Sequence, residues 1–275
     1  MEENVITSVQ NARVKHVVAL QQKSSLRREE GLFVVEGQRE IEHCIGCGYE
    51  VVELFLLKGR EACSCAGSVL ATPHHRTSVP PTYVTPQVYE KMAYRESTEG
   101  IIAVARAKGH QLKDLQLRKP NPLIVVLERV EKPGNLGAIL RTAEAAGVDA
   151  VIVCDPLTDL YNPNLIRASI GGVFSVPTAA CTSQDCIAFL KAQGISILTA
   201  QLQDSYEYYD YDMRRATAIV MGTESTGLTQ QWREAADAHI RIPMLGGLDS
   251  LNVSVSAAIL MYEAVRQRHQ QKTSK

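Results

Sequence analysis

An arginine on a stripe of small side chains is the first residue in this sequence that could do chemistry. In the segment 128–147, Arg141 shares one face of an expected helix with the glycines and alanines at 134, 137, 138 and 145. Such a bare face lets a ligand or another backbone approach the guanidinium, whose planar fork matches phosphate oxygens. Asn135 is placed to cap this helix or to stand in its first turn. Taken alone, the segment is better explained as a capping asparagine and a surface arginine.

A second candidate segment follows an apolar run directly. In MGTESTGL, residues 221–228, Gly222 and Gly227 bracket Glu224 and two hydroxyl side chains. Glycine permits positive φ or a close approach of the backbone to a ligand. Glycine-rich turns are also common as plain connections between a strand and a helix, so this loop alone is not decisive.

The third segment, IRIPMLGGLDSLNVSVSAA at 240–258, ends a strand at Pro243 and begins a helix with polar residues, among them Asn252 and Ser254. Polar side chains at a helix start can cap it, bind a ligand or bond their own backbone. Ligands of parallel sheets bind at the carboxyl ends of the strands. Three such loops at one edge of a sheet therefore predict a binding site there.

Other familiar sites are not indicated. The sequence has no G-x-G-x-x-G after a strand, no G-x-x-x-x-G-K-[ST] and no G-x-S-x-G, which disfavours dinucleotide, P-loop and hydrolase chemistry. The best metal candidate combines Cys44-x-x-Cys47 with Cys63, Cys65 and the histidines 74 and 75. Its second half has the wrong spacing for a zinc ribbon, and core packing explains Cys44, so we expect no metal.

The elements that would position these loops alternate regularly in the second half of the chain. Apolar runs at 123–127, 151–153, 195–198 and 217–221 resemble strands covered on both faces, and helical patterns occur at 135–146, 163–170, 183–193 and 228–237. This order predicts an α/β domain with a parallel sheet and helices on both faces. A last long helix is expected to begin near Leu251.

The first half reads as a smaller α/β domain. Short strands are expected at 33–37, 49–57, 82–86 and 100–105, with a helix at 38–47. The segment 107–122 is polar, basic and ends with two prolines. We therefore expect one domain at 1–106, a linker at 107–122 and a second domain at 123–275.

Composition adds limits on partners and compartment. The 275 residues are 45% hydrophobic and 21% charged, which is typical of a globular protein, and no apolar run is long enough to cross a bilayer. The start lacks the apolar core of a signal peptide, and seven cysteines without an export signal favour free thiols in a reducing cytoplasm. The net charge is −1, yet the segments 4–28 and 101–119 are basic and suit phosphate binding unless they are simply solvated surface.

Three motifs in order now resemble a known family. They are N-x-G-x-x-x-R (Asn135, Gly137, Arg141), G-x-E-x-x-G (Gly222, Glu224, Gly227) and I-P-M…S-L-N-V-S-x-S-A (Ile242 to Ala257). Together they resemble the motifs of the SpoU/TrmH family of RNA ribose 2′-O-methyltransferases, in the SPOUT superfamily. The first domain resembles the substrate-binding domain, similar to a small ribosomal protein, that precedes the catalytic part in many members.

The resemblance implies a deep trefoil knot in the second domain, a homodimer, and S-adenosylmethionine bound in the knot. The residues it implies for the cofactor are Thr199, Ala200, Gly222, Ile242 and Leu251. Those it implies for catalysis are Arg141, Asn135, Glu224, Asn252 and Ser254. Affinity for RNA would come from Arg13, Lys15, Arg27 and Arg28 in the first domain.

The chemistry of these residues favours one role for Arg141. A guanidinium stays protonated in proteins, so we prefer phosphate binding and stabilisation of alkoxide character in the 2′-oxygen over general-base catalysis. A composite site across the dimer is a hypothesis, because small residues surround Arg141. Ribosomal RNA of the 23S type is the preferred substrate because of the extra domain. The alternatives are a transfer-RNA methyltransferase, a catalytically silent RNA-binding assembly factor, and an enzyme of free nucleotides.

Overall fold

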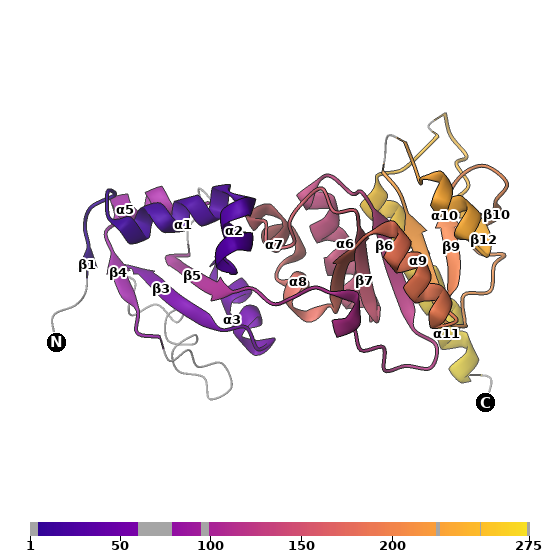
Figure 1. Ribbon diagram of the computed structural model, residues 1–275, viewed down its shortest axis with the longest axis horizontal. Helices are drawn as coiled ribbons and strands as arrows, with labels where there is room; N and C mark the ends of the chain where they lie inside the picture. Colours follow the sequence, from indigo (N-terminus) through magenta and orange to yellow (C-terminus); the bar gives the residue numbers. More distant parts are fainter. Residues whose placement is uncertain (1–4, 60–78, 95–98, 224–225, 248, 274–275) are drawn as a thin grey trace. The chain divides into compact units, whose positions relative to one another are not determined.

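The computed structural model describes residues 5–59, 79–94, 99–223, 226–247 and 249–273 (Figure 1). The chain divides into two compact units: unit 1 comprises Met1–Lys108 and Asp159–Ser175, and unit 2 comprises Gly109–Thr158 and Val176–Lys275. The boundaries expected from the sequence assign 159–175 to the second domain, whereas the contacts group this segment with unit 1. No helix in the described ranges is long and apolar enough to span a bilayer.

Unit 2 is built on a seven-stranded parallel sheet, as the sequence predicts. Its order is β10-β12-β9-β11-β6-β7-β8, and every neighbouring pair runs parallel. The strands are β6 (Leu123–Glu128), β7 (Ala150–Cys154), β8 (Thr178–Cys181), β9 (Ser196–Ala200), β10 (Tyr206–Glu207), β11 (Thr217–Met221) and β12 (Ala238–Arg241). Strands β8 and β10 were not expected, because one is short and rich in alanine and the other has only two residues.

Helices cover both faces of this sheet because its central strands are apolar throughout. Every residue of β6, β7 and β11 is buried. On one face lie α9 (Ser183–Ala192) and α10 (Gln230–Ala235), whose Cys186, Leu190 and Trp232 pack against alternate strand residues such as Ile124 and Val220. The helices α6 (Pro133–Ala146) and α11 (Val253–Thr273) pack against each other, and α11 also contacts β11 (Figure 1).

A buried acid joins three elements of unit 2. Glu128, at the end of β6, is 1% exposed and accepts hydrogen bonds from the backbone N–H of Thr229 at 2.8 Å and from its hydroxyl at 2.6 Å. The Ser183 hydroxyl, at the start of α9, lies 3.3 Å from Glu128 Oε1 and accepts from Trp232 Nε1 at 3.0 Å. A buried carboxylate is costly without such donors, so this network fixes where α9 and α10 begin.

Unit 1 contains a five-stranded mixed sheet in the order β1-β4-β3-β5-β2. Its strands are β1 (Val5–Ile6), β2 (Leu32–Glu36), β3 (Val51–Leu57), β4 (Thr82–Val84) and β5 (Ile101–Arg106). Its helices are α1 (Ala12–Gln22), α2 (Ser24–Glu30), α3 (Gln38–Gly46), α5 (Pro86–Met92), α7 (Pro163–Ser169) and α8 (Gly172–Ser175). Apolar residues of α1 and α5, among them Val17 and Val88, pack with Phe55 of the sheet in one core.

An aromatic cluster explains why 159–175 belongs to unit 1. The ring of Tyr161 stacks on Phe33 of β2 with centroids 4.2 Å apart, and Tyr49 and Phe174 meet edge-on at 5.1 Å. Aromatic pairs of this kind add to the stabilisation from buried area. The segment therefore completes the core of unit 1, which the spacing of strands along the sequence gave no reason to expect.

Arg27 lies inside unit 1 and not on a surface that RNA can reach. It is only 4% exposed, and its guanidinium pairs with Asp159 and donates to the main-chain oxygens of Leu20 and Gln21. Its neighbour Arg28 is exposed. The sequence-based role of Arg27 in RNA binding is therefore replaced by a structural one: it joins the end of α1 to the segment that begins at Asp159.

Replacing Arg27 with alanine should destabilise unit 1. The change leaves the Asp159 carboxylate, 15% exposed, without its cation, and breaking a buried pair costs about 3–5 kcal/mol. We expect urea unfolding followed by circular dichroism to show this loss. The matched change Arg28→Ala should alter the free energy of unfolding by less than about 0.5 kcal/mol. Equal stability of the two variants would contradict the structural role of Arg27.

Candidate active site

A cavity of about 380 Å³ opens at the carboxyl ends of β9, β11 and β12. A volume of this size lies within the range of small-molecule sites. Its walls come from the loops after the three strands and from the start of α11. The lining residues include Ala200, Gln201, Met221, Gly222, Gly227, Leu228, Arg233, Ile242, Leu251 and Leu260. The cavity therefore lies at the edge that the sequence predicts, where the loops after parallel strands meet.

The loop after β11 folds back tightly on itself. The N–H of Thr223 donates to Gly227 O at 3.3 Å, and the N–H of Gly227 donates to Thr223 O at 3.1 Å. A Cβ atom at Gly222 would lie 2.3 Å from the main-chain carbon of Gly227. Gly227 has a φ of +67°, which other residues rarely adopt. Both glycines are therefore needed for this turn, and they leave a wall of bare backbone beside the cavity.

Two buried polar atoms of cavity residues lack a hydrogen-bond partner in the described part of the chain: Gln201 Oε1 and Arg233 Nε. One is an acceptor and the other a donor, and leaving them unpaired costs free energy unless a ligand or water meets them. Neither residue is among the candidates that the sequence motifs indicate. Gln201 directly follows β9, so its position after a strand was the signal that could have identified it; Arg233, within α10, had none.

The first and third motifs meet through a side-chain hydrogen bond. Asn252 Nδ2 donates to Asn135 Oδ1 at 3.2 Å across 117 residues of sequence. Asn252 Oδ1 in turn accepts from the Ser254 backbone N–H at 2.9 Å and from its hydroxyl at 2.6 Å. A smaller hollow of about 120 Å³ is lined by Asn135, Gly222 and Thr223 among others. Residues of all three motifs therefore lie around this hollow and the Asn135–Asn252 hydrogen bond.

Some of the other expected site residues do not line the cavity or the hollow. Arg141 is exposed on α6 and does not line the cavity, whereas Asn135 stands in the first turn of the same helix. Of the residues expected to bind the cofactor, Thr199 does not line the cavity: it is fully buried and its hydroxyl lies 2.6 Å from His239 Nδ1. The other four, Ala200, Gly222, Ile242 and Leu251, line the cavity. Glu224 lies outside the described residues.

The remaining candidates lie in unit 1. Lys15 and Arg28 are exposed, while Arg13 is partly buried, pairs with Glu53 at 2.6 Å and donates to the Thr82 hydroxyl. Of the metal candidates considered in the sequence, Cys44 is buried and Cys47 is partly exposed. Cys63, Cys65, His74 and His75 lie outside the described residues.

Comparison with protein families gives two matches. Residues 122–262 match the model of the SpoU rRNA Methylase family. Residues 11–103 match the model of the MRM3-like substrate binding domain. The first covers unit 2 from β6 into α11 and includes all three motifs.

Similar proteins extend over nearly the whole chain. A 23S rRNA (uridine(2479)-2′-O)-methyltransferase of Streptomyces viridochromogenes is 31% identical over 269 residues, covering 96% of this chain and 92% of that protein. A solved RNA 2′-O ribose methyltransferase is 37% identical with a TM-score of 0.84, covering 96% and 99% of the two chains. The SpoU methyltransferase AviRb of Streptomyces viridochromogenes, solved in complex with AdoMet, is 28% identical with a TM-score of 0.85, covering 94% and 100%.

Replacing Gly222 with alanine should impair the cavity while the fold survives. The added methyl group meets backbone rather than a movable side chain, so the turn has to shift at a cost of about 1–3 kcal/mol. Isothermal titration with S-adenosylmethionine, the ligand that the sequence resemblance implies, should give a Kd raised about tenfold or more. In the control Gly134→Ala the new methyl group meets nothing within 4 Å, so the Kd should stay unchanged. Unchanged affinity in Gly222→Ala would disprove the need for glycine there.

Proposed function

Because the chain belongs to the SpoU rRNA methylase family, we propose that it transfers a methyl group from S-adenosylmethionine to a ribose 2′-hydroxyl of 23S-type ribosomal RNA. One structural observation carries the proposal: the Asn135–Asn252 hydrogen bond joins two motifs beside a cavity whose wall contains the third. An RNA methyltransferase needs this arrangement, because the methyl donor and the acceptor oxygen have to be held in line.

The cavity suits the cofactor on chemical grounds. Apolar side chains such as Met221, Leu228 and Leu260 can hold an adenine ring, and the backbone at Gly222 permits close approach. The unpartnered Gln201 Oε1 and Arg233 Nε offer an acceptor and a donor to hydroxyl and carboxylate groups of the ligand. When bound, S-adenosylmethionine supplies a methyl group that is already electrophilic. The chain's own task is therefore to position and polarise the ribose oxygen.

Three polar residues beside the cavity perform this task in our proposal. Asn135 and Asn252 fix each other's orientation, and Ser254 fixes Asn252 by two further hydrogen bonds. The amide groups of the two asparagines, held in this arrangement, orient the ribose. The Arg141 guanidinium binds the adjacent phosphate and stabilises the negative charge that develops on the 2′-oxygen, whose proton passes to solvent water.

Arg141 acts in a site completed by a second copy of the chain. It lies six residues after Asn135 on α6, about one and two-thirds turns further along, so the two side chains leave the helix in different directions. The small residues around Arg141 permit close approach of another backbone. We therefore propose a homodimer in which Arg141 of one protomer serves the cavity of its partner. A trefoil knot around the loops that form the cavity is part of the same proposal, supported by the family.

Unit 1 provides affinity for RNA in this proposal, with residues 1–106 as the substrate-binding domain and 123–275 as the catalytic one. Exposed Lys15 and Arg28 on α1 and α2, with Arg13 beside them, offer cations to phosphates. The relatives that act on ribosomal RNA match both domains, which favours this substrate over transfer RNA. Ribosomal RNA as substrate also implies work in the cytoplasm.

Methyl transfer from labelled S-adenosylmethionine to separated, unmodified ribosomal and transfer RNA tests the function. We expect label in ribosomal RNA. The change Arg141→Ala should reduce it about 100-fold or more, because a preorganised donor to developing charge typically contributes that much. Arg141→Lys keeps the charge but loses the planar fork, and we expect an intermediate loss. Cofactor affinity should be unchanged in both variants.

Other outcomes of this assay are equally informative. Undiminished transfer by Arg141→Lys would refute a role that depends on the guanidinium geometry. Label only in transfer RNA would keep the chemistry and replace the substrate. No label in either RNA, nor in assembled subunits, with intact cofactor binding, would favour a silent RNA-binding assembly factor.

Mixing two impaired variants tests the composite site, in an assay with S-adenosylmethionine kept well below the Kd of Gly222→Ala so that this variant alone has little activity. Arg141→Ala removes the arginine and Gly222→Ala damages the cavity. In a mixed dimer, the intact cavity of the Arg141→Ala protomer is paired with the intact Arg141 of the Gly222→Ala protomer, so one of the two sites is complete. After the two proteins are unfolded and refolded together, activity should return to about one quarter of the wild-type value, because about half of the dimers are mixed. Each variant refolded alone is the control. If the mixture stays as inactive as the single variants, Arg141 serves the cavity of its own chain.

A further inference from the structure

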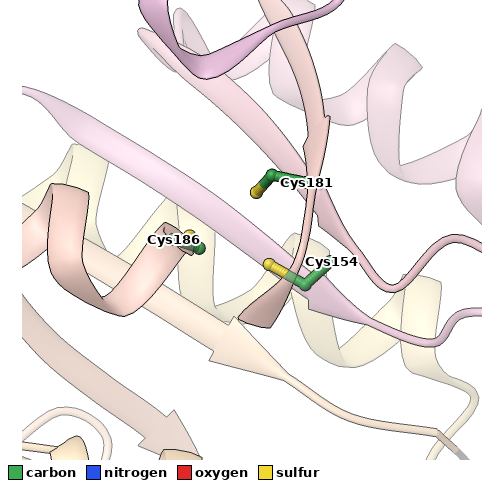
Figure 2. Close-up of side chains that lie close together, drawn as sticks. All are labelled: Cys154, Cys181 and Cys186. Atoms are coloured by element: carbon green, nitrogen blue, oxygen red, sulfur yellow. The ribbon is translucent and has the colours of Figure 1, made fainter. Parts of the chain in front are cut away.

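Three cysteines converge on the sheet of unit 2 away from the cavity. Cys154 ends β7, Cys181 ends β8 and Cys186 lies in the second turn of α9, and their sulfur atoms all lie within 4.8 Å of one another (Figure 2). In the order of the sheet, β7 and β8 lie on the opposite side of β6 from β9 and β12. The cluster is therefore separate from the candidate active site.

The positions of the three cysteines are fixed by β7, β8 and α9. Cys154 and Cys181 are register partners on neighbouring parallel strands, so their side chains leave the sheet on the same face. That face is covered by α9, whose N-terminus is held by the Thr182 hydroxyl accepting from the Asp185 N–H and by the Ser183 side chain at Asp155. The spacing of 154, 181 and 186 along the sequence gives no metal-binding motif, so the cluster exists only in the folded chain.

We propose that Cys154, Cys181 and Cys186 form a binding site for one thiophilic d¹⁰ metal ion, such as Zn²⁺ or Cu⁺. Three sulfur ligands at about 2.3 Å from a common ion lie about 4 Å from one another, a spacing that small rotamer adjustments of these side chains reach. Thiolates select soft ions of this class over Mg²⁺ or Ca²⁺. Three protein ligands leave one coordination position of Zn²⁺ for solvent.

The surroundings suit a cation with thiolate ligands. The carboxylates of Asp155 and Asp185 adjoin Cys154 and Cys186 in the sequence and place negative charge near the cluster, which a bound cation would offset. Cys154 and Cys186 are fully buried, whereas Cys181 is partly exposed, so an ion can enter from its side.

A bound ion would tie together β7, β8 and α9, since each supplies one ligand. Helix α9 also carries Ser183, which contacts the buried Glu128. The plain alternative is that the three thiols are small apolar residues of the core, a common use of cysteine. The two interpretations differ in one measurable property: only a metal site binds one ion per chain through all three sulfurs.

Titration of the reduced, chelator-treated full chain with Cd²⁺ tests the proposal through the ultraviolet charge-transfer absorption of thiolate–Cd²⁺ bonds. We expect a signal that saturates at one ion per chain and is reversed by competition with Zn²⁺. Cys181→Ser, the change at the least buried ligand, should weaken binding at least tenfold, and Cys186→Ala should do the same. The control variant Cys47→Ser/Cys63→Ser/Cys65→Ser keeps the cluster and should keep the signal.

Thermal unfolding ensures that each variant is folded, and in the wild type the added ion should raise the Tm. The proposal is overturned if the folded wild type gives no saturable signal, or if the signal survives in both Cys181→Ser and Cys186→Ala. It is also overturned if the control variant loses the signal, since the ion then binds elsewhere. Formation of a disulfide among the three cysteines in place of ion binding, detected by mass, would identify a redox pair instead.

Discussion

The buried carboxylate of Glu128 is the interaction on which unit 2 most depends. It ends β6, an inner strand of the parallel sheet, and the carboxylate has to be met by donors because water does not reach it. Thr229 supplies two of them. Thr229 is also the last residue of the loop that begins at Gly222. Its two hydrogen bonds to Glu128 therefore fix the position at which that loop ends. The shape of the cavity wall thus follows from the solvation of one acid.

The parallel sheet could be predicted because its strands carry a strong signal. Uninterrupted apolar runs such as 123–127 and 217–221 have to be covered on both faces, and the helical patterns between them supply the cover. The edge that bears the site follows from the same topology, since the loops after β9, β11 and β12 meet there. Strands β8 and β10 carried no such signal, because β8 has four residues with small side chains and β10 has only two residues.

The contacts that depend on distant parts of the chain could not be predicted. Nothing local in the sequence indicates that Asn252 meets Asn135, that a Cβ at Gly222 would strike Gly227, or that Arg27 is buried against Asp159. In each case the residue type indicates only a polar or a flexible position, and the contact that the residue makes depends on how distant parts of the chain pack. Thr199 illustrates the same limit: it follows the predicted strand pattern, but the alternation of side chains turns it toward His239, and Ala200 faces the cavity instead.

The first motif illustrates why adjacency in sequence is a poor guide to a site. Helical periodicity directs Asn135 and Arg141 away from α6 in different directions, although both belong to one motif of seven residues. The asparagine is engaged within its own chain by Asn252, whereas the arginine is exposed with small residues around it. One face of α6 can therefore contribute Asn135 to the site of its own chain, and the other face can contribute Arg141 to the site of a second chain. The motif would then describe a contact between two chains as much as a site within one.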